Sequence, residues 1–312
     1  MNTSTPNNTR LRGVLAPVLT PFDAQGRPDA TRWIAHCRWL LDQQVGLAIF
    51  GTNSEAASLS VDERIDLTDA LLATGVPAHR LMPGTGACSV TDAVRLTRHA
   101  VHNGAAGALM LPPFYFKPAS DEGLYAYCAE VIERVGDARL KIYLYHIPQF
   151  TGVPITLKLI DMLRKRYPQT VVGAKDSSGQ WDNTLAMLEH HAADGFDVFP
   201  ASESTLSKAL PLGAAGCISA TVNMNPAGIQ AVYKRWHTPE GPALQAQADA
   251  VRQVFQAAPM IPAMKRVLAE RLNDPVWCNV RPPLVALDDT TAKQVLAQLN
   301  AVGFGTPNYP RV

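Results

Sequence analysis

Lys175 is the residue of this chain that most directly suggests a reaction. It ends the apolar run Val171-Val172-Gly173-Ala174 and is followed at once by Asp176. A strand this short and apolar is expected to be buried, and withdrawal from water lowers the pKa of a lysine. A neutral amine in such a place is a nucleophile that forms Schiff bases with carbonyl compounds. The ordinary alternative is a solvated lysine at a strand end, so the neighbours of Lys175 must decide.

Tyr145 is the predicted acid and base beside this lysine. Carbinolamine formation, dehydration and enamine protonation each move a proton, so the amine needs a partner that transfers protons. Tyr145 and Tyr143 share one face of the run Tyr143-Leu144-Tyr145-His146, because side chains alternate along a strand, and His146 faces the other way. A phenol on the adjacent strand lies within hydrogen-bond reach of Lys175. The alternative is a core tyrosine with a satisfied hydroxyl.

The turn Gly51-Thr52-Asn53-Ser54-Glu55 follows another apolar run. Its backbone N–H groups can point at a carboxylate, and the hydroxyl of Thr52 can relay protons onward. A glycine turn is weak evidence when taken alone, because many proteins contain one.

Eight short apolar runs alternate with amphipathic segments that are long enough to be helices. The runs occupy residues 14–19, 46–51, 80–84, 107–111, 141–146, 171–175, 197–200 and 216–220. This alternation predicts an α/β fold, a (β/α)8 TIM barrel with a C-terminal helical extension. Functional groups of such barrels lie at the C-terminal ends of the strands. Lys175, Tyr145 and Thr52 are therefore expected to meet at one mouth.

Helix start signals support this division. Ser60 and Glu63 have the spacing of a capping box, Thr156 precedes an apolar stripe, and Asn225 precedes a proline. Further helical patterns near 242–257, 261–272 and 289–301 follow the last run. We predict a flexible leader at residues 1–12, a barrel at 13–224, and C-terminal helices at 225–312 that pack on the barrel as part of the same unit.

Composition excludes several classes of function. The 312 residues are 47% hydrophobic and 18% charged with a net charge of +1, which gives no electrostatic case for nucleic acid or an anionic membrane. The chain has no apolar stretch of about eighteen residues, the length that a membrane span requires. Five scattered cysteines without a CxxC motif fit neither a disulfide framework nor a zinc site and favour a reducing cytoplasm.

The motifs, in this order, resemble the dihydrodipicolinate synthase / N-acetylneuraminate lyase superfamily, the DapA-like class I pyruvate aldolases. The resemblance runs from Gly13-Val14-Leu15-Ala16-Pro17 to Val280-Arg281-Pro282-Pro283-Leu284. It implies that Lys175 forms the Schiff base, that Tyr145 is the catalytic tyrosine, and that Thr52 belongs to a proton relay.

The same resemblance implies further roles. Gly51, Thr52 and Asn53 would hold the keto-acid carboxylate, and the backbone of Ile218 would line that site. Tyr115 looks like the relay tyrosine that relatives reach across a subunit interface, so a homo-oligomer is expected, a dimer or a tetramer.

Two departures bear on the substrate. Dihydrodipicolinate synthases carry an arginine before Thr-Gly that binds the aldehyde's carboxylate, whereas this chain has Phe150 before Thr151-Gly152. A phenyl ring cannot replace that charge-assisted contact, so aspartate semialdehyde is a doubtful substrate. Ser202 and Glu203 fall where neuraminate lyases place acidic residues that bind the sugar, and only Glu203 is acidic here.

These residues predict a lyase that joins Lys175 to pyruvate or a 2-keto-3-deoxy acid and makes or breaks a carbon–carbon bond, without a cofactor. The second substrate or product would be an aldehyde. The same residues also suit a 2-keto-3-deoxy acid dehydratase, or a 4-hydroxy-tetrahydrodipicolinate synthase with a non-standard semialdehyde site. A metal- or phosphate-dependent barrel and a catalytically inactive barrel are the alternatives from other classes.

Overall fold

The strands are short and parallel. The computed structural model describes residues 10–305 and Tyr309, and within this part of the chain the strands form two sheets. One sheet has the order β2-β1-β7 and the other β3-β4-β5-β6. Their bounds are β1 (Gly13–Ala16), β2 (Gly46–Leu47), β3 (Ala108–Met110), β4 (Ile142–His146), β5 (Val171–Asp176), β6 (Asp197–Pro200) and β7 (Gly216–Ile218).

Hydrogen bonds join the two sheets on both sides. On one side, Leu47 pairs with Leu81 and Gly84 pairs with Leu109, so the segment between them connects β2 to β3. On the other side, the N–H of Ala215 donates to the carbonyl of Val198 at 2.9 Å, which connects β7 to β6. The strands therefore follow one another around a ring, which is the predicted α/β barrel.

The strand predicted at residues 80–84 is the exception. Only isolated bridges at Leu81 and Gly84 take its place. Pro83 has no N–H to donate to a neighbouring strand, which interrupts the ladder, although its carbonyl still accepts from Leu109 at 2.8 Å. The segment keeps its place in the ring without forming a continuous strand.

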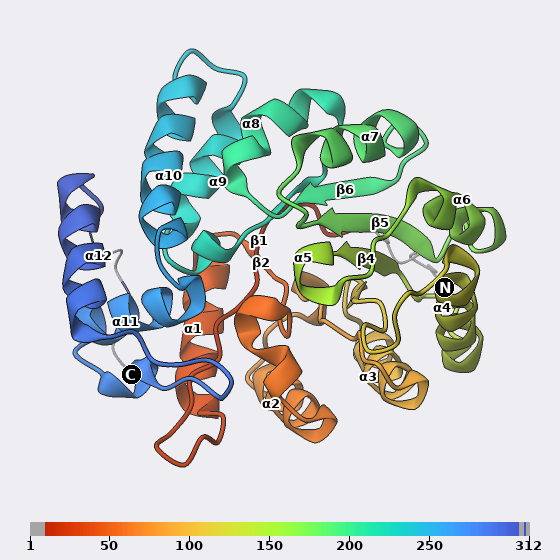
Figure 1. Ribbon diagram of the computed structural model, residues 1–312, viewed down its shortest axis with the longest axis horizontal. Helices are drawn as coiled ribbons and strands as arrows, with labels where there is room; N and C mark the ends of the chain where they lie inside the picture. Colours follow the sequence, from red (N-terminus) through yellow and green to blue (C-terminus); the bar gives the residue numbers. More distant parts are fainter. Residues whose placement is uncertain (1–9, 306–308, 310–312) are drawn as a thin grey trace, which may run out of the picture.

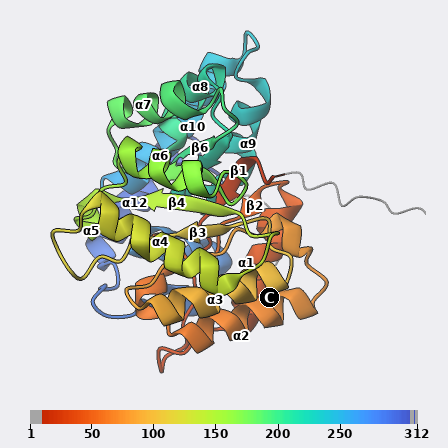
Figure 2. The ribbon, with the colours of Figure 1, turned by 90° about the vertical axis from the view of Figure 1, so that its right-hand side faces the viewer.

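Helices surround the strands, as Figures 1 and 2 show. They are α1 (Ala30–Asp42), α2 (Val61–Ala73), α3 (Val90–His102), α4 (Asp121–Val135), α5 (Pro148–Thr151), α6 (Leu157–Arg166), α7 (Trp181–His191), α8 (Leu206–Ala209) and α9 (Pro226–Arg235). The three predicted start signals are confirmed: Ser60 forms a capping box with Glu63 before α2, Thr156 caps α6, and Asn225 caps α9.

Three more helices gather on one side of the barrel, at the left of Figure 1: α10 (Gly241–Gln256), α11 (Met260–Leu272) and α12 (Asp289–Ala301). We call them the C-terminal helices. They share a hydrophobic core with Leu19 and Ala220, which belong to segments following β1 and β7. Phe255, Met264 and Trp277 are the large buried members of that core. The domain boundaries predicted at residues 12 and 224 stay predictions.

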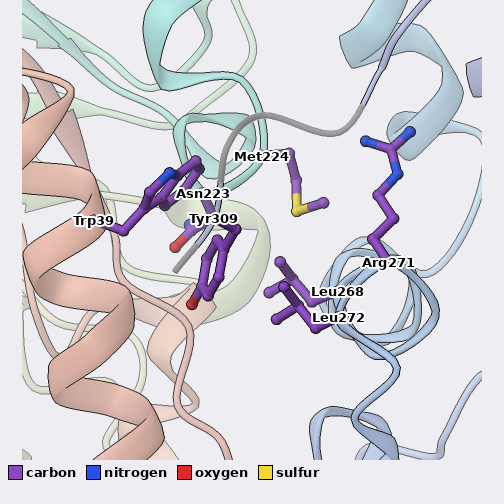
Figure 3. A pocket seen from close by; sticks show the side chains of 7 residues that line it. All are labelled: Trp39, Asn223, Met224, Leu268, Arg271, Leu272 and Tyr309. Atoms are coloured by element: carbon purple, nitrogen blue, oxygen red, sulfur yellow. The ribbon is translucent and has the colours of Figure 1, made fainter. Parts of the chain in front are cut away.

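A small recess lies between α1 and α11, and the side chain of Tyr309 forms part of its wall (Figure 3). Its lining residues are Trp39, Asn223, Met224, Leu268, Arg271, Leu272 and Tyr309. None of the residues predicted to do chemistry is among them.

The floor of the barrel is tied to the start of the described chain. Residues 1–9 of the predicted leader lie outside the described residues. Arg12 pairs with the buried carboxylate of Asp197 at 2.6 Å, and Arg10 donates to the carbonyl of Gly195 at 2.6 Å. Asp197 also accepts from the hydroxyl of Tyr143 at 3.2 Å, so several elements meet at this carboxylate.

Candidate active site

Lys175, Tyr145 and Thr52 lie side by side. Strands β4 and β5 pair with Tyr145 opposite Lys175, and the Nζ of Lys175 donates to the hydroxyl of Tyr145 at 3.3 Å. That hydroxyl is also 3.0 Å from the Oγ1 of Thr52, where either oxygen can be the donor. The predicted proximity of amine and phenol is therefore confirmed. A chain of three exchangeable groups now links the amine to the turn that follows β2.

The amine sits in a nearly dry environment. Lys175 is 2% exposed and Tyr145 is 3% exposed. The Nζ also lies 4.3 Å from the centroid of the Tyr145 ring, so phenol and amine are held together by ring face and hydroxyl. The one hydrogen-bond partner of the amine among the described residues is therefore the phenol, which can exchange a proton with it.

Gly173 makes room for a ring below the lysine. A Cβ at Gly173 would lie 2.5 Å from the Tyr143 ring and 2.5 Å from the carbonyl oxygen of Asp197. The space predicted beside Lys175 is therefore filled by the Tyr143 ring, which is fully buried. Burial raises the pKa of Tyr143, and the Asp197 carboxylate acts in the same direction. Tyr143 thus stays a neutral supporting residue.

The turn after β2 is fixed in position by its contacts with neighbouring segments. Thr52–Ser54 form a single 3₁₀ turn, and the hydroxyl of Thr20 donates to the carbonyl of Ser54 at 2.8 Å. A Cβ at Gly84 would come within 2.0 Å of the Phe50 carbonyl oxygen, so a glycine is required for this approach. A Cβ at Gly51 would meet nothing within 4 Å, which leaves open space beside the turn.

Glu203 does not face an open site. Its carboxylate accepts from the hydroxyls of Ser219 and Thr221 and pairs with Arg252 of α10 at 2.8 Å, and the residue is fully buried. Ser202 caps the short helix at Glu203–Thr205, accepting from the N–H of Ser204 at 3.2 Å. The carboxylate of Glu203 is thus occupied by partners of the protein itself.

Ile218 lies at the end of β7, where it is fully buried and pairs with Leu15 of β1. Its backbone therefore belongs to the strand ring, as a residue lining the barrel requires. Its contact with a keto acid stays a prediction.

Two aromatic side chains of the predicted site are strongly exposed. Tyr115 is 76% exposed and packs edge to face on Phe116, and Phe150 of α5 is 70% exposed. Among the hydrogen bonds of the described residues, none links Tyr115 to Thr52 or Tyr145. The structure of the single chain therefore does not bring Tyr115 into the relay.

His146 and Asp176 follow Tyr145 and Lys175 on their strands, and both are buried. The Nδ1 of His146 accepts from the N–H of Ile155 at 2.8 Å, and Asp176 accepts from the Thr184 hydroxyl at 2.6 Å. Burial lowers the pKa of His146, and the carboxylate of Asp176 partly opposes this shift. Across residues 10–305 and Tyr309, no three His, Cys, Asp or Glu side chains are grouped so that they could hold a metal ion.

Sequence reasoning missed the cations that support the site from the C-terminal helices. Lys265 of α11 pairs with Glu55 at 2.6 Å, and Arg252 of α10 pairs with Glu203. Lys265 lies within the run Pro262-Ala263-Met264-Lys265 of a buried helix face. The signal in the sequence was a lysine on the apolar face of a predicted helix, because a buried ammonium group almost always has an acidic partner.

A model of the Dihydrodipicolinate synthetase family matches residues 10–302 of this chain. The chain belongs to this family. An uncharacterized DapA-like lyase of Chloroflexus aurantiacus is 33% identical over 303 residues, covering 95% of this chain and 98% of that protein.

Solved structures of the dihydrodipicolinate synthetase family agree with the fold. Dihydrodipicolinate synthase from Agrobacterium tumefaciens superposes with a TM-score of 0.86 at 29% identity, covering 94% of this chain and 99% of that chain. YagE from E. coli K12, a family member solved in complex with pyruvate, gives a TM-score of 0.85 at 25% identity, covering 95% and 100%. Members of the family are Schiff-base lyases, so this chain is an enzyme of the class I aldolase and lyase type.

Among the described residues, none of the helices combines the length and apolar character needed to cross a membrane.

Proposed function

We propose that the enzyme forms a Schiff base between Lys175 and pyruvate or a 2-keto-3-deoxy acid and makes or cleaves the neighbouring carbon–carbon bond. The observation that carries this proposal is the chain Lys175 Nζ, Tyr145 hydroxyl, Thr52 Oγ1, with separations of 3.3 and 3.0 Å. A nearly dry amine with a phenol and a second hydroxyl in series is what imine formation demands. The pyruvate bound by the related YagE supports a keto acid as the ligand.

In the direction of synthesis, the neutral amine of Lys175 attacks the C2 carbonyl carbon of the keto acid. Tyr145 protonates the departing hydroxyl, so water leaves and the imine forms. Loss of a C3 proton gives the enamine, whose C3 attacks the aldehyde carbon, and a proton on the new alkoxide completes the step. Water then releases the product and restores the amine. The protonated imine is the electron sink, so the proposed reaction needs no metal or organic cofactor.

The turn Gly51-Thr52-Asn53 is the proposed anchor for the keto-acid carboxylate, together with the backbone of Ile218. The open space beside Gly51 supports this assignment, because a ligand can approach the turn there. Asn53 stands where the motif that this turn resembles has a second threonine, and its amide can still donate a hydrogen bond to a carboxylate.

The aldehyde end is proposed to be uncharged or apolar. Phe150 occupies the position at which an arginine would bind a carboxylate, and its exposure leaves it free to meet a substrate. The burial of Glu203 beneath Arg252 argues against a role for its carboxylate in binding sugar hydroxyls. A 2-keto-3-deoxy acid dehydratase uses the same imine and remains the second candidate, because Tyr145 is equally placed to protonate a departing hydroxyl.

The enzyme is proposed to act as a homo-oligomer, a dimer or a tetramer, in the cytoplasm. The exposure of Tyr115 supports the homo-oligomer, because this side chain is free to enter the proton relay of a second subunit. All five cysteines are free, which suits a reducing compartment.

Solvent exchange of the pyruvate methyl group tests the proposal without knowledge of the aldehyde. In D₂O, an enzyme that forms the enamine replaces the methyl protons of pyruvate by deuterium, and the methyl signal in the proton NMR spectrum decays. Lys175→Ala should exchange no faster than buffer. Exchange at the same rate in this variant and in the wild type would refute the proposal.

A further inference from the structure

Glu55 and Lys265 form an ion pair that is closed to solvent and lies directly behind the proposed carboxylate turn. The Nζ of Lys265 is 2.6 Å from the Oε1 of Glu55, and the two side chains are 0% and 1% exposed. Glu55 immediately follows the 3₁₀ turn at Thr52–Ser54, whereas Lys265 belongs to α11. The pair therefore joins the turn to a helix 210 residues away in the sequence.

Both oxygens of the Glu55 carboxylate have partners. Oε2 accepts from the backbone N–H of Arg281 at 2.9 Å. The ammonium of Lys265 also lies 4.6 Å from the centroid of the Phe22 ring, and the Arg281 guanidinium lies 4.9 Å from the same ring. These contacts leave Glu55 no freedom to change its side-chain position.

The backbone links Glu55 to Thr52. The N–H of Glu55 donates to the carbonyl of Thr52 at 3.0 Å, and Glu55 itself has a left-handed backbone with φ of 56°. A non-glycine residue in this region costs free energy and is kept there by its surroundings. When the side chain of Glu55 is fixed, the conformation that presents the Thr52 hydroxyl and the Asn53 amide is fixed with it.

We propose that Glu55 and Lys265 are positioning residues that set the turn Gly51-Thr52-Asn53 for the keto-acid carboxylate, an inference that rests on the proposed function. The C-terminal helices are thereby part of the catalytic apparatus and not only a cover for one side of the barrel. A buried ion pair is a poor source of stability compared with apolar side chains of similar volume. Directional geometry, which apolar packing does not supply, is what this pair adds to the turn.

The test compares Lys265→Met with Arg12→Met. Lys265→Met keeps most of the side-chain volume but leaves Glu55 without its cation. Arg12→Met is the control away from the turn, because it removes a half-exposed cation from a fully buried carboxylate, that of Asp197, at the barrel floor, where Arg10 remains at 3.3 Å. Each protein is incubated with increasing pyruvate and borohydride, and the reduced adduct is measured by mass spectrometry. Circular dichroism shows that each variant is folded.

The proposal predicts that Lys265→Met needs about tenfold more pyruvate for half-maximal trapping while the fold is retained, and that Arg12→Met needs the wild-type concentration. A folded Lys265→Met protein that is less stable but saturates with pyruvate as the wild type does would overturn it, since the pair would then serve stability alone. If Lys265→Met does not fold, Glu55→Gln is measured in its place with the same two outcomes, because the amide has one acceptor oxygen where Lys265 and the N–H of Arg281 need two. Absence of any adduct in the wild type would overturn the proposed function, and this inference with it.

Discussion

The Tyr145 hydroxyl lies 3.3 Å from the Lys175 amine and 3.0 Å from the Thr52 hydroxyl. A phenol in this position can give a proton to the hydroxyl that leaves the carbinolamine and recover it through Thr52. The ring contributes separately, because its face lies 4.3 Å from the Nζ. Hydroxyl and ring can therefore be separated by mutation.

Tyr145→Phe keeps the ring and removes the hydroxyl. We expect kcat to fall by about 10²- to 10⁴-fold, the range that a positioned acid and base contributes. Tyr143→Phe is the control, because Tyr143 lies on the same face of β4 but donates to Asp197 at the barrel floor. Its kcat should stay near the wild-type value, as measured by steady-state kinetics. Equal losses in both variants would contradict the role given to Tyr145.

Phe150→Arg tests the proposal that Phe150 selects an uncharged or apolar aldehyde. A guanidinium can bind a carboxylate in a bidentate manner, so kcat/KM with pyruvate and aspartate semialdehyde should rise by about tenfold or more. Phe116→Arg adds the same charge at another exposed aromatic residue and should bring no gain. Efficient condensation of aspartate semialdehyde by the wild type would show that the interpretation of Phe150 is wrong.

The elements show where sequence reasoning succeeds. Caps and apolar stripes are local, and the helices that begin after Ser60, Thr156 and Asn225 do so as predicted. The pairing of Tyr145 with Lys175 also followed from local signals, because side-chain alternation and strand order suffice to place them. The prediction of a continuous strand at 80–84 was wrong. The apolar residues there suggest a strand, but Pro83 has no N–H to donate and interrupts the ladder.

Contacts between elements that are distant in the sequence could not be predicted from it. Lys265 and Glu55 are 210 residues apart, and no periodicity relates them. The capture of Glu203 by Arg252 is of the same kind, because the carboxylate's partner comes from α10. Such pairs depend on how the C-terminal helices pack on the barrel.

Helix α1 carries a buried histidine that makes its packing sensitive to pH. The Nε2 of His36 is 3.0 Å from the Oδ1 of Asn223, and its Nδ1 is 2.8 Å from the hydroxyl of Tyr309, whose position Figure 3 shows. The amide oxygen can only accept, so Nε2 carries the proton and Nδ1 accepts from the tyrosine. Burial lowers the pKa of His36 from 6.5 to about 4.

The unfolded chain therefore binds a proton at His36 at a higher pH than the folded chain does. The contribution of His36 to the free energy of unfolding is fully present above about pH 6.5. It is lost as the pH falls toward 4, by roughly 3 kcal/mol in total. His36→Gln can keep both hydrogen bonds but does not titrate. The free energy of urea unfolding should thus fall more steeply with pH in the wild type. Parallel profiles between pH 7 and 4 would contradict the burial of a neutral His36.

At the scale of the whole molecule, the proposed proton relay lacks one member within the single chain, Tyr115. Tyr115 is exposed and edge-packed on Phe116, and its proposed place beside Thr52 requires a second subunit. This arrangement makes a prediction about mixed oligomers. Lys175→Ala subunits lack the amine but can lend a tyrosine, whereas Tyr115→Phe subunits keep the amine and lack the tyrosine.

Co-expression of these two variants should restore activity in hybrid oligomers. One site of each hybrid pair then contains both Lys175 and a tyrosine from its neighbour, so random pairing recovers up to about a quarter of wild-type activity. Each variant alone, at the same total concentration, is the control. A mixture no more active than the sum of its components would place Tyr115 outside the neighbour's site.

The central claim is that Lys175 forms the imine, and trapping with borohydride tests it most directly. Protein is incubated with pyruvate, reduced, digested and examined by mass spectrometry. We predict that the wild type gains one reduced pyruvyl group per chain, on the peptide that contains Lys175, and that Lys175→Ala gains none. A folded wild-type protein that acquires no adduct, or that acquires it at another lysine, would contradict the account.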